Sequence, residues 1–193
     1  MPSSLRVEIN QALPYRVVLI HWVSVALVLI AASAVLSREL IEDRGIRTAL
    51  LSVHRSAGLL VFAVTWLRLL ISPWVVHRNA IDPNLWRRSA AMISHLVLYG
   101  ALVVIPLLGW AQTSASGKQD SFLGLLPLPA IVAKNRDLAE TLQSAHTNAA
   151  IVLLAVILLH SGAALWHHFF HGDATLKRML SSRRSLLDQG NKT

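Results

Sequence analysis

Ala145 to Phe170 reads AHTNAAIVLLAVILLHSGAALWHHFF, and this stretch decides the fold. Its 26 residues include no Asp, Glu, Lys or Arg, which is enough for a helix that crosses a bilayer with some tilt. His146 and His160 lie 14 residues apart, so they share one helical face, about 21 Å apart at roughly 1.5 Å per residue. His167 follows on nearly the same face. Histidines within the hydrocarbon core of a membrane mark functional positions. Two histidines at different depths on the same helix face suit two metal centres, one above the other.

Composition assigns the chain to the membrane proteins. Its 193 residues are 54% hydrophobic and 15% charged, with a mean hydropathy of +0.52, which excludes an ordinary soluble domain. Four apolar stretches stand at about residues 17–37, 54–76, 90–111 and 145–170. The loops between them are too short for a separate soluble domain. We therefore predict one all-α domain over residues 1–193, an integral membrane four-helix bundle.

The basic residues predict the orientation of this bundle. Both tails and the loop between the second and third stretches hold 11 Lys and Arg (Arg6, Arg16, Arg68, Arg78, Arg87, Arg88, Lys177, Arg178, Arg183, Arg184, Lys192). The opposite side holds 7 (Arg38, Arg44, Arg47, Arg55, Lys118, Lys134, Arg136) and six of the ten acidic residues. By the positive-inside rule both termini are cytoplasmic. The net charge of +8 then reflects topology, and no basic stripe with exposed aromatics points to nucleic acid.

The N-terminus and the cysteine count narrow the chemistry. Pro14-Tyr15-Arg16 leads directly into the first apolar stretch without a small-residue cleavage site, so we predict no cleaved signal peptide. Cysteine is absent, which rules out disulfides, thiolate ligands, iron–sulfur clusters and covalent haem attachment. Metal ligation is thereby restricted to His, Met and carboxylates.

The histidines fall at two depths of the predicted bundle. His54 and His146 lie near the external edge, whereas four others lie near the cytoplasmic edge (His21, His95, His160, His167). Haem b needs two imidazoles that face each other across a flat macrocycle, with apolar walls and cations for its propionates. Zinc would need three or four close ligands, and a proton relay would ordinarily include an acidic residue within the spans, which is missing here. The pattern therefore favours two haem b sites.

For several residues near these histidines, the sequence allows two interpretations of the role of each. Gly58, one turn after His54, would let a flat ligand approach the second helix, or would let two helices pack closely. Arg55 and Arg68 would pair with carboxylates or extend to lipid headgroups. The external connection, residues 112–144, contains the apolar run 122–129, which is too short to span and is predicted to lie in the interface and cap the bundle.

Five histidine motifs resemble those of the bacterial cytochrome b561 family. They are Ile20-His21-Trp22, Val53-His54-Arg55-Ser56-Ala57-Gly58, His95-Leu96-Val97-Leu98-Tyr99, His146-Thr147-Asn148 and the run from Leu159 to Phe169. The resemblance covers about residues 15–180. It implies an inner-membrane protein of four helices with two haems b, ligated by His21 with His160 and by His54 with His146. Spacing alone supports His146 and His160 but leaves His160, His167 and His95 open as the partner of His21.

The resemblance also implies a reaction. The family's best-defined activity is superoxide oxidation at the external haem, with the electron passing to the inner haem and on to ubiquinone. On this interpretation His95 and His167 line the quinone pocket, although hydrogen bonding between helices explains them equally well. Arg55, Lys118 and Lys134 would steer the superoxide anion inward.

Two other functions stay open. The first is an electron-transfer subunit that links a partner redox protein to the quinone pool. The second is a haem-free structural membrane protein, which would leave the histidines of the spans unpaired in lipid at a high cost in free energy.

Overall fold

Four long helices and one short hairpin make up the described part of the chain. The computed structural model describes residues 14–71, 85–119, 121–171, 176 and 179. The helices are α1 (Tyr15–Glu39), α2 (Arg44–Ile71), α4 (Leu85–Ala115) and α5 (Arg136–His171). Strands β1 (Ser121–Phe122) and β2 (Leu126–Pro127) pair antiparallel between α4 and α5. All four helices are long and apolar enough to cross a membrane, so the predicted all-α membrane architecture is confirmed.

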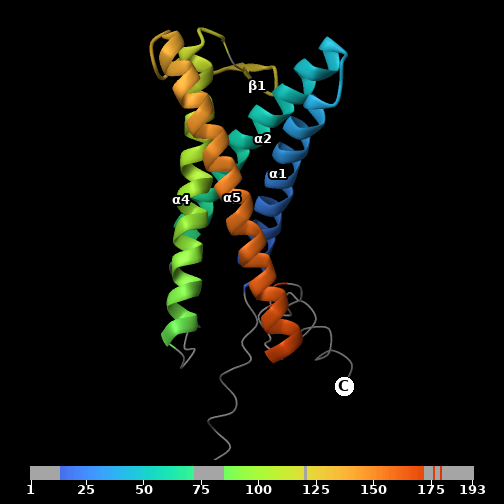
Figure 1. Ribbon diagram of the computed structural model, residues 1–193, viewed down its shortest axis with the longest axis vertical. Helices are drawn as coiled ribbons and strands as arrows, with labels where there is room; N and C mark the ends of the chain where they lie inside the picture. Colours follow the sequence, from blue (N-terminus) through green and yellow to red (C-terminus); the bar gives the residue numbers. More distant parts are fainter. Residues whose placement is uncertain (1–13, 72–84, 120, 172–175, 177–178, 180–193) are drawn as a thin grey trace, which may run out of the picture.

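The four helices form two antiparallel pairs. α1 packs along α2 and α4 packs along α5, while α2 also crosses α4, as Figure 1 shows. The α1–α2 connection and the β hairpin lie at the top of Figure 1, and we call this the outer end. The start of α1 and the end of α5 lie at the opposite, inner end (Figure 1). Both ends of the bundle are thus defined by connectivity, and their orientation in a membrane stays a prediction.

Small residues bring α1 and α2 together. The buried positions of these two helices are Val17, Val18, Ser24 and Ala34 on α1, and Ser56, Ala57, Val61 and Thr65 on α2. The hydroxyls of Ser24 and Thr65 donate to the carbonyls of Ile20 and Val61 in their own helices, at 2.8 and 2.7 Å. These polar groups are satisfied without water, and their small side chains permit close helix packing within a bilayer.

The helices extend beyond the apolar stretches from which they were predicted. α2 begins at Arg44 because Asp43 accepts a hydrogen bond from the backbone N–H of Ile46 at 2.8 Å, which caps the helix. Its predicted last part, residues 72–76, and the basic tail lie outside the described residues. α4 runs without interruption through Pro106, to Ala115.

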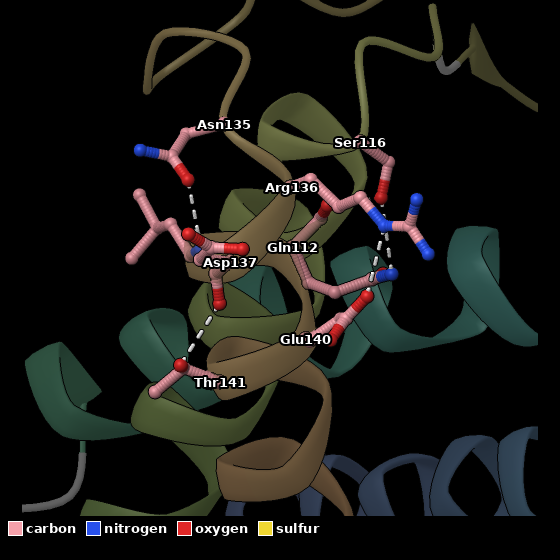
Figure 2. A network of polar contacts seen from close by, with 8 residues as sticks. Gln112, Ser116, Asn135, Arg136, Asp137, Glu140 and Thr141 are labelled. Atoms are coloured by element: carbon pink, nitrogen blue, oxygen red, sulfur yellow. Dashed lines mark hydrogen bonds and ion pairs between the residues drawn. The ribbon is translucent and has the colours of Figure 1, made fainter.

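The predicted external connection over residues 112–144 is the largest correction, because α4 and α5 both extend into it. α5 begins at Arg136, where Asn135 Oδ1 accepts a hydrogen bond from the backbone N–H of Leu138 at 3.0 Å. Arg136 pairs with Glu140 one turn later at 3.1 Å, as Figure 2 shows. Polar residues can be helical here because the cap and the i, i+4 ion pair provide partners for their backbone and side-chain groups. A prediction based on apolar stretches alone cannot detect such a helix start.

The remaining connection crosses the outer end of the bundle. The backbone N–H of Leu123 donates to Ser56 Oγ on α2 at 3.0 Å, while Trp110 Nε1 donates to the Pro129 carbonyl at 3.1 Å. Leu123 and Gly124 both adopt positive φ angles, 55° and 72°, which close the tight turn. The β hairpin therefore joins the α4–α5 pair to α2, in the capping position expected for this run (Figure 1).

Candidate functional site

The outer site consists of two histidines whose rings meet in a T-shaped arrangement. His54 comes from α2 and His146 from α5, and each lies ten residues after the outer end of its helix. Their ring centres are 6.0 Å apart and the ring planes are nearly perpendicular, at 81°. The structure thus brings together the two histidines that the sequence placed at one depth.

Backbone carbonyls orient both rings. His54 Nδ1 lies 2.8 Å from the carbonyl oxygen of Ala31 on α1, and His146 Nδ1 lies 3.0 Å from that of Ile105 on α4. A carbonyl only accepts, so each Nδ1 must carry the proton. Each Nε2 is then left with its lone pair, which is the usual arrangement of a metal-binding histidine whose other nitrogen is held by a hydrogen bond.

The spacing of the two rings fits an iron atom between them. A metal bound by both Nε2 atoms, at about 2 Å each, holds the ring centres about 6 Å apart. The observed separation is 6.0 Å. Within the described residues no group of three or more His, Cys, Asp or Glu is close enough to hold one metal ion. Two facing imidazoles are the protein ligand set of a haem b, and the outer pair fits that group.

Gly109 is a site residue that sequence reasoning missed. A Cβ at this position of α4 would lie 3.1 Å from His146 Cε1 and 3.2 Å from His146 Nδ1. The absence of a side chain therefore lets the imidazole reach the Ile105 carbonyl, one turn earlier. The only sequence signal was a glycine inside an apolar helix, which has a packing or functional reason in many cases.

Gly58 stands beside open space. A Cβ built there meets nothing within 4 Å, so none of the described helices packs closely against it. Of the two interpretations given to Gly58, close helix packing is therefore wrong. An open backbone face one turn from His54 leaves room for a flat ligand.

The inner site is a cluster rather than a facing pair. The rings of His95 on α4 and His160 on α5 have centres 5.3 Å apart at 68°. His21 on α1 lies within electrostatic range of both, and of Arg68 on α2. All four helices therefore contribute to this cluster, and the geometry keeps both His21 and His95 as partners of His160.

Two inner residues lie at the margin of this cluster. Trp22, next to His21, donates its indole N–H to the Met179 carbonyl at 2.9 Å, which ties the start of α1 to the chain after α5. His167 lies two turns beyond His160 toward the inner end and is half-buried. Its predicted place in a quinone pocket stays a prediction.

The basic residues predicted to steer an anion are dispersed. Lys118 lines a groove with Trp110 and Ser114, whereas Lys134 lines a separate groove with Gln112 and Glu140. Neither groove includes His54, His146 or Arg55. Both lysines are exposed, and Arg55 is half-buried on α2 next to His54. The structure thus places Arg55 beside the outer pair and the lysines at the rim of the outer end.

Comparisons of the sequence with known proteins show the family that this chain matches. The sequence model of the family described as Prokaryotic cytochrome b561 matches residues 12–182. The chain is similar to "Cytochrome b561 homolog 1" of Escherichia coli (strain K12), 34% identical over 173 residues, covering 86% of this chain and 94% of that protein. It is also 31% identical over 170 residues to "Probable superoxide oxidase CybB" of Yersinia pestis, covering 86% of this chain and 93% of that protein.

Proposed function

The chain belongs to the prokaryotic cytochrome b561 family of membrane electron-transfer proteins, and from this premise we propose that it carries two haems b and oxidises superoxide with ubiquinone as the acceptor. In the proposed reaction, two superoxide anions lose one electron each to give two molecules of oxygen. One ubiquinone takes up both electrons and two protons to give ubiquinol. The donor would react at the outer end and the acceptor at the inner end of a bacterial inner-membrane protein.

The facing outer histidines carry this proposal. Their ring separation of 6.0 Å and their backbone-anchored Nδ1 atoms support the proposal that the two Nε2 atoms would hold one haem iron. Haem b, when bound, supplies one-electron redox chemistry that protein side chains at this site cannot supply. His54 and His146 would hold the outer haem, and His160 with His21 or His95 would hold the inner one.

The remaining residues have proposed roles in access and proton supply. Arg55, beside His54, and the exposed Lys118 and Lys134 would raise the local concentration of an anionic donor at the outer end. Whichever of His95 and His21 is not an inner ligand, together with His167, would donate hydrogen bonds to quinone carbonyl oxygens. The "superoxide oxidase" in the name of one relative, at 31% identity, supports this choice of donor.

The test is superoxide-dependent ubiquinol formation by the purified protein in liposomes. The wild type is expected to form ubiquinol when superoxide is generated outside, and superoxide dismutase is expected to abolish the product. Lys118→Gln combined with Lys134→Gln should slow the reaction at low salt and change it little at high salt, where charges are screened. A protein that contains two haems but is not reduced by superoxide would contradict the proposed donor.

The outer surface favours a second candidate, an electron-transfer subunit for a partner redox protein. The tip of the β hairpin exposes Leu123, Leu125 and Leu126, with 86% of Leu125 accessible. An apolar projection at the outer end would suit a docked protein better than a small anion. Retained haem with no superoxide activity, together with reduction by a purified partner dehydrogenase, would favour this alternative.

A further inference from the structure

Among the residues that the structure describes, Arg68 is a charged side chain without a carboxylate to pair with. It stands in the last turn of α2, near the inner end of the bundle. Residues 15–38, 44–71, 85–115 and 141–171 contain no Asp or Glu, so the helices offer no acidic partner at this depth. Within the described residues Arg68 makes no salt bridge, and its buried Nε has no hydrogen-bond partner. A buried guanidinium nitrogen without a partner is costly in free energy in a bilayer protein, which points to a ligand at this position.

The side chain points into the bundle. Its guanidinium carbon lies 5.2 Å from the centre of the Tyr99 ring on α4. It is within electrostatic range of His21 on α1, His95 on α4 and His160 on α5. An arginine that extends to lipid headgroups would turn away from these helices. The observed direction therefore favours a partner inside the inner cluster over a lipid phosphate.

The chemistry of that partner follows from the guanidinium group. Arginine presents planar, paired N–H donors that match a carboxylate. The described residues supply no carboxylate here, whereas a haem b brings two propionate carboxylates to any site that holds it. The π-face of Tyr99 would hold the guanidinium in position by a cation–π contact.

We propose that Arg68 binds a propionate of the inner haem and that its charge raises the reduction potential of that haem. This proposal rests on the proposed function, because it requires a haem at the inner cluster. A positive charge in a medium of low dielectric constant stabilises the state that holds one more electron. Arg68 would thereby favour electron movement from the outer end toward the inner end, and it acts as a positioning residue, without touching the iron.

The test compares four purified proteins: the wild type, Arg68→Gln, Arg68→Lys and the control Arg44→Gln. Arg44 is exposed in the first turn of the same helix, so its replacement changes the net charge equally without touching either site. Haem per chain is quantified, and the midpoint potential of each haem is measured by optical redox titration. We expect Arg68→Gln to lower one of the two midpoints or to lose one haem. Arg68→Lys should keep both haems, and Arg44→Gln should match the wild type.

Two results would overturn the assignment. One is an Arg68→Gln protein that keeps both haems with unchanged midpoints. The other is a haem loss in Arg68→Lys as complete as that in Arg68→Gln, because lysine keeps the charge. Failure of the proposed function looks different: without haem binding the wild type itself would contain no haem, and with another donor the wild type would keep both haems but would not be reduced by superoxide.

Discussion

At the scale of single residues, two carbonyls and one glycine prepare the outer site. Ala31 and Ile105 accept the Nδ1 protons of His54 and His146, and this leaves both Nε2 atoms for a metal. Loss of one such supporting hydrogen bond typically costs about 10- to 100-fold in metal affinity. The position of these rings therefore depends on α1 and α4, which contribute no outer histidine of their own.

Replacing Gly109 by Ala should weaken haem binding at the outer site. The new Cβ would stand 3.1 Å from the His146 ring and push it away from the Ile105 carbonyl. Loss of a supporting contact of this kind costs about tenfold or more in affinity. Haem per chain, measured after purification at limiting haem, is expected to fall toward half of the wild-type value.

Gly100→Ala is the matched control for Gly109→Ala. Gly100 lies nine residues earlier on α4, on the opposite side of the helix, and a Cβ there meets nothing within 4 Å. Both replacements raise helix propensity by up to about 1 kcal/mol. Equal haem content in the two variants would mean that the contact with His146 is unimportant.

Depth along each helix could be predicted from the sequence, whereas the roles of the histidines stay predictions. Helical spacing placed His54 with His146 and grouped His21, His95 and His160, because position along a helix sets depth in a bilayer. Spacing could not identify Gly109, Ala31 or Ile105, since their role depends on which helix faces which. It also left His160, His167 and His95 open as the partner of His21, and the inner cluster brings His21, His95 and His160 together.

At the scale of elements, capping residues set where the helices begin. Hydrophobicity predicted the apolar centre of each helix but put the start of the last one at residue 145, whereas α5 begins at Arg136. The signal was present in the sequence as Asn135 followed by the acidic Asp137 and the pair Arg136 and Glu140. Cap patterns are informative when helices project beyond the lipid, where hydropathy says little.

Asn135→Ala should destabilise the first turn of α5. Its Oδ1 accepts the Leu138 N–H, and loss of such a cap typically costs about 1 kcal/mol. Hydrogen exchange is expected to accelerate several-fold at residues 137–140 and to stay unchanged around His160. Asn135→Ser, which can still cap, should exchange like the wild type, and faster exchange in the serine variant would exclude capping as the cause.

Ser56→Ala should release the β hairpin from α2. The Leu123 N–H would lose its acceptor, at a cost of about 1 kcal/mol. Leu123, at φ 55°, is itself in a conformation that a non-glycine residue adopts at some cost, so the turn depends on contacts such as this hydrogen bond. Faster exchange at Leu123 is the expected result. Ser52→Ala, one turn earlier on α2, is the control. Equal hydrogen exchange at Leu123 in both variants would mean that the hydrogen bond between Leu123 and Ser56 does not hold the β hairpin.

At the scale of the whole molecule, two helix pairs enclose two histidine clusters at different depths. α1 with α2 and α4 with α5 form the pairs (Figure 1). Each group of histidines takes residues from both pairs. Little of the apolar surface of α4 and α5 is buried within the chain, which suits helices that face lipid and bound cofactors. Binding of haem between the pairs would therefore contribute to the stability of the bundle itself.

The distribution of basic residues predicts that both termini are cytoplasmic. Reporter fusions test this directly. Alkaline phosphatase, which is active only outside the inner membrane, should be active when fused after Lys118 and inactive when fused after Thr193. A fluorescent protein that requires the cytoplasm should give the reverse pattern. Activity of phosphatase at the C-terminus would contradict the orientation and would exchange the proposed donor and acceptor sides.

The most direct test of the central claim is a reduced-minus-oxidised absorbance spectrum of the detergent-purified protein, with haem quantified per chain. We predict a b-type spectrum and two haems per chain, falling to one in His54→Ala and to one in His160→Ala, with the two variants losing spectrally or potentiometrically different haems. A purified, folded wild type that contains no haem would contradict the account, and it would leave a four-helix membrane protein whose clustered histidines serve another purpose.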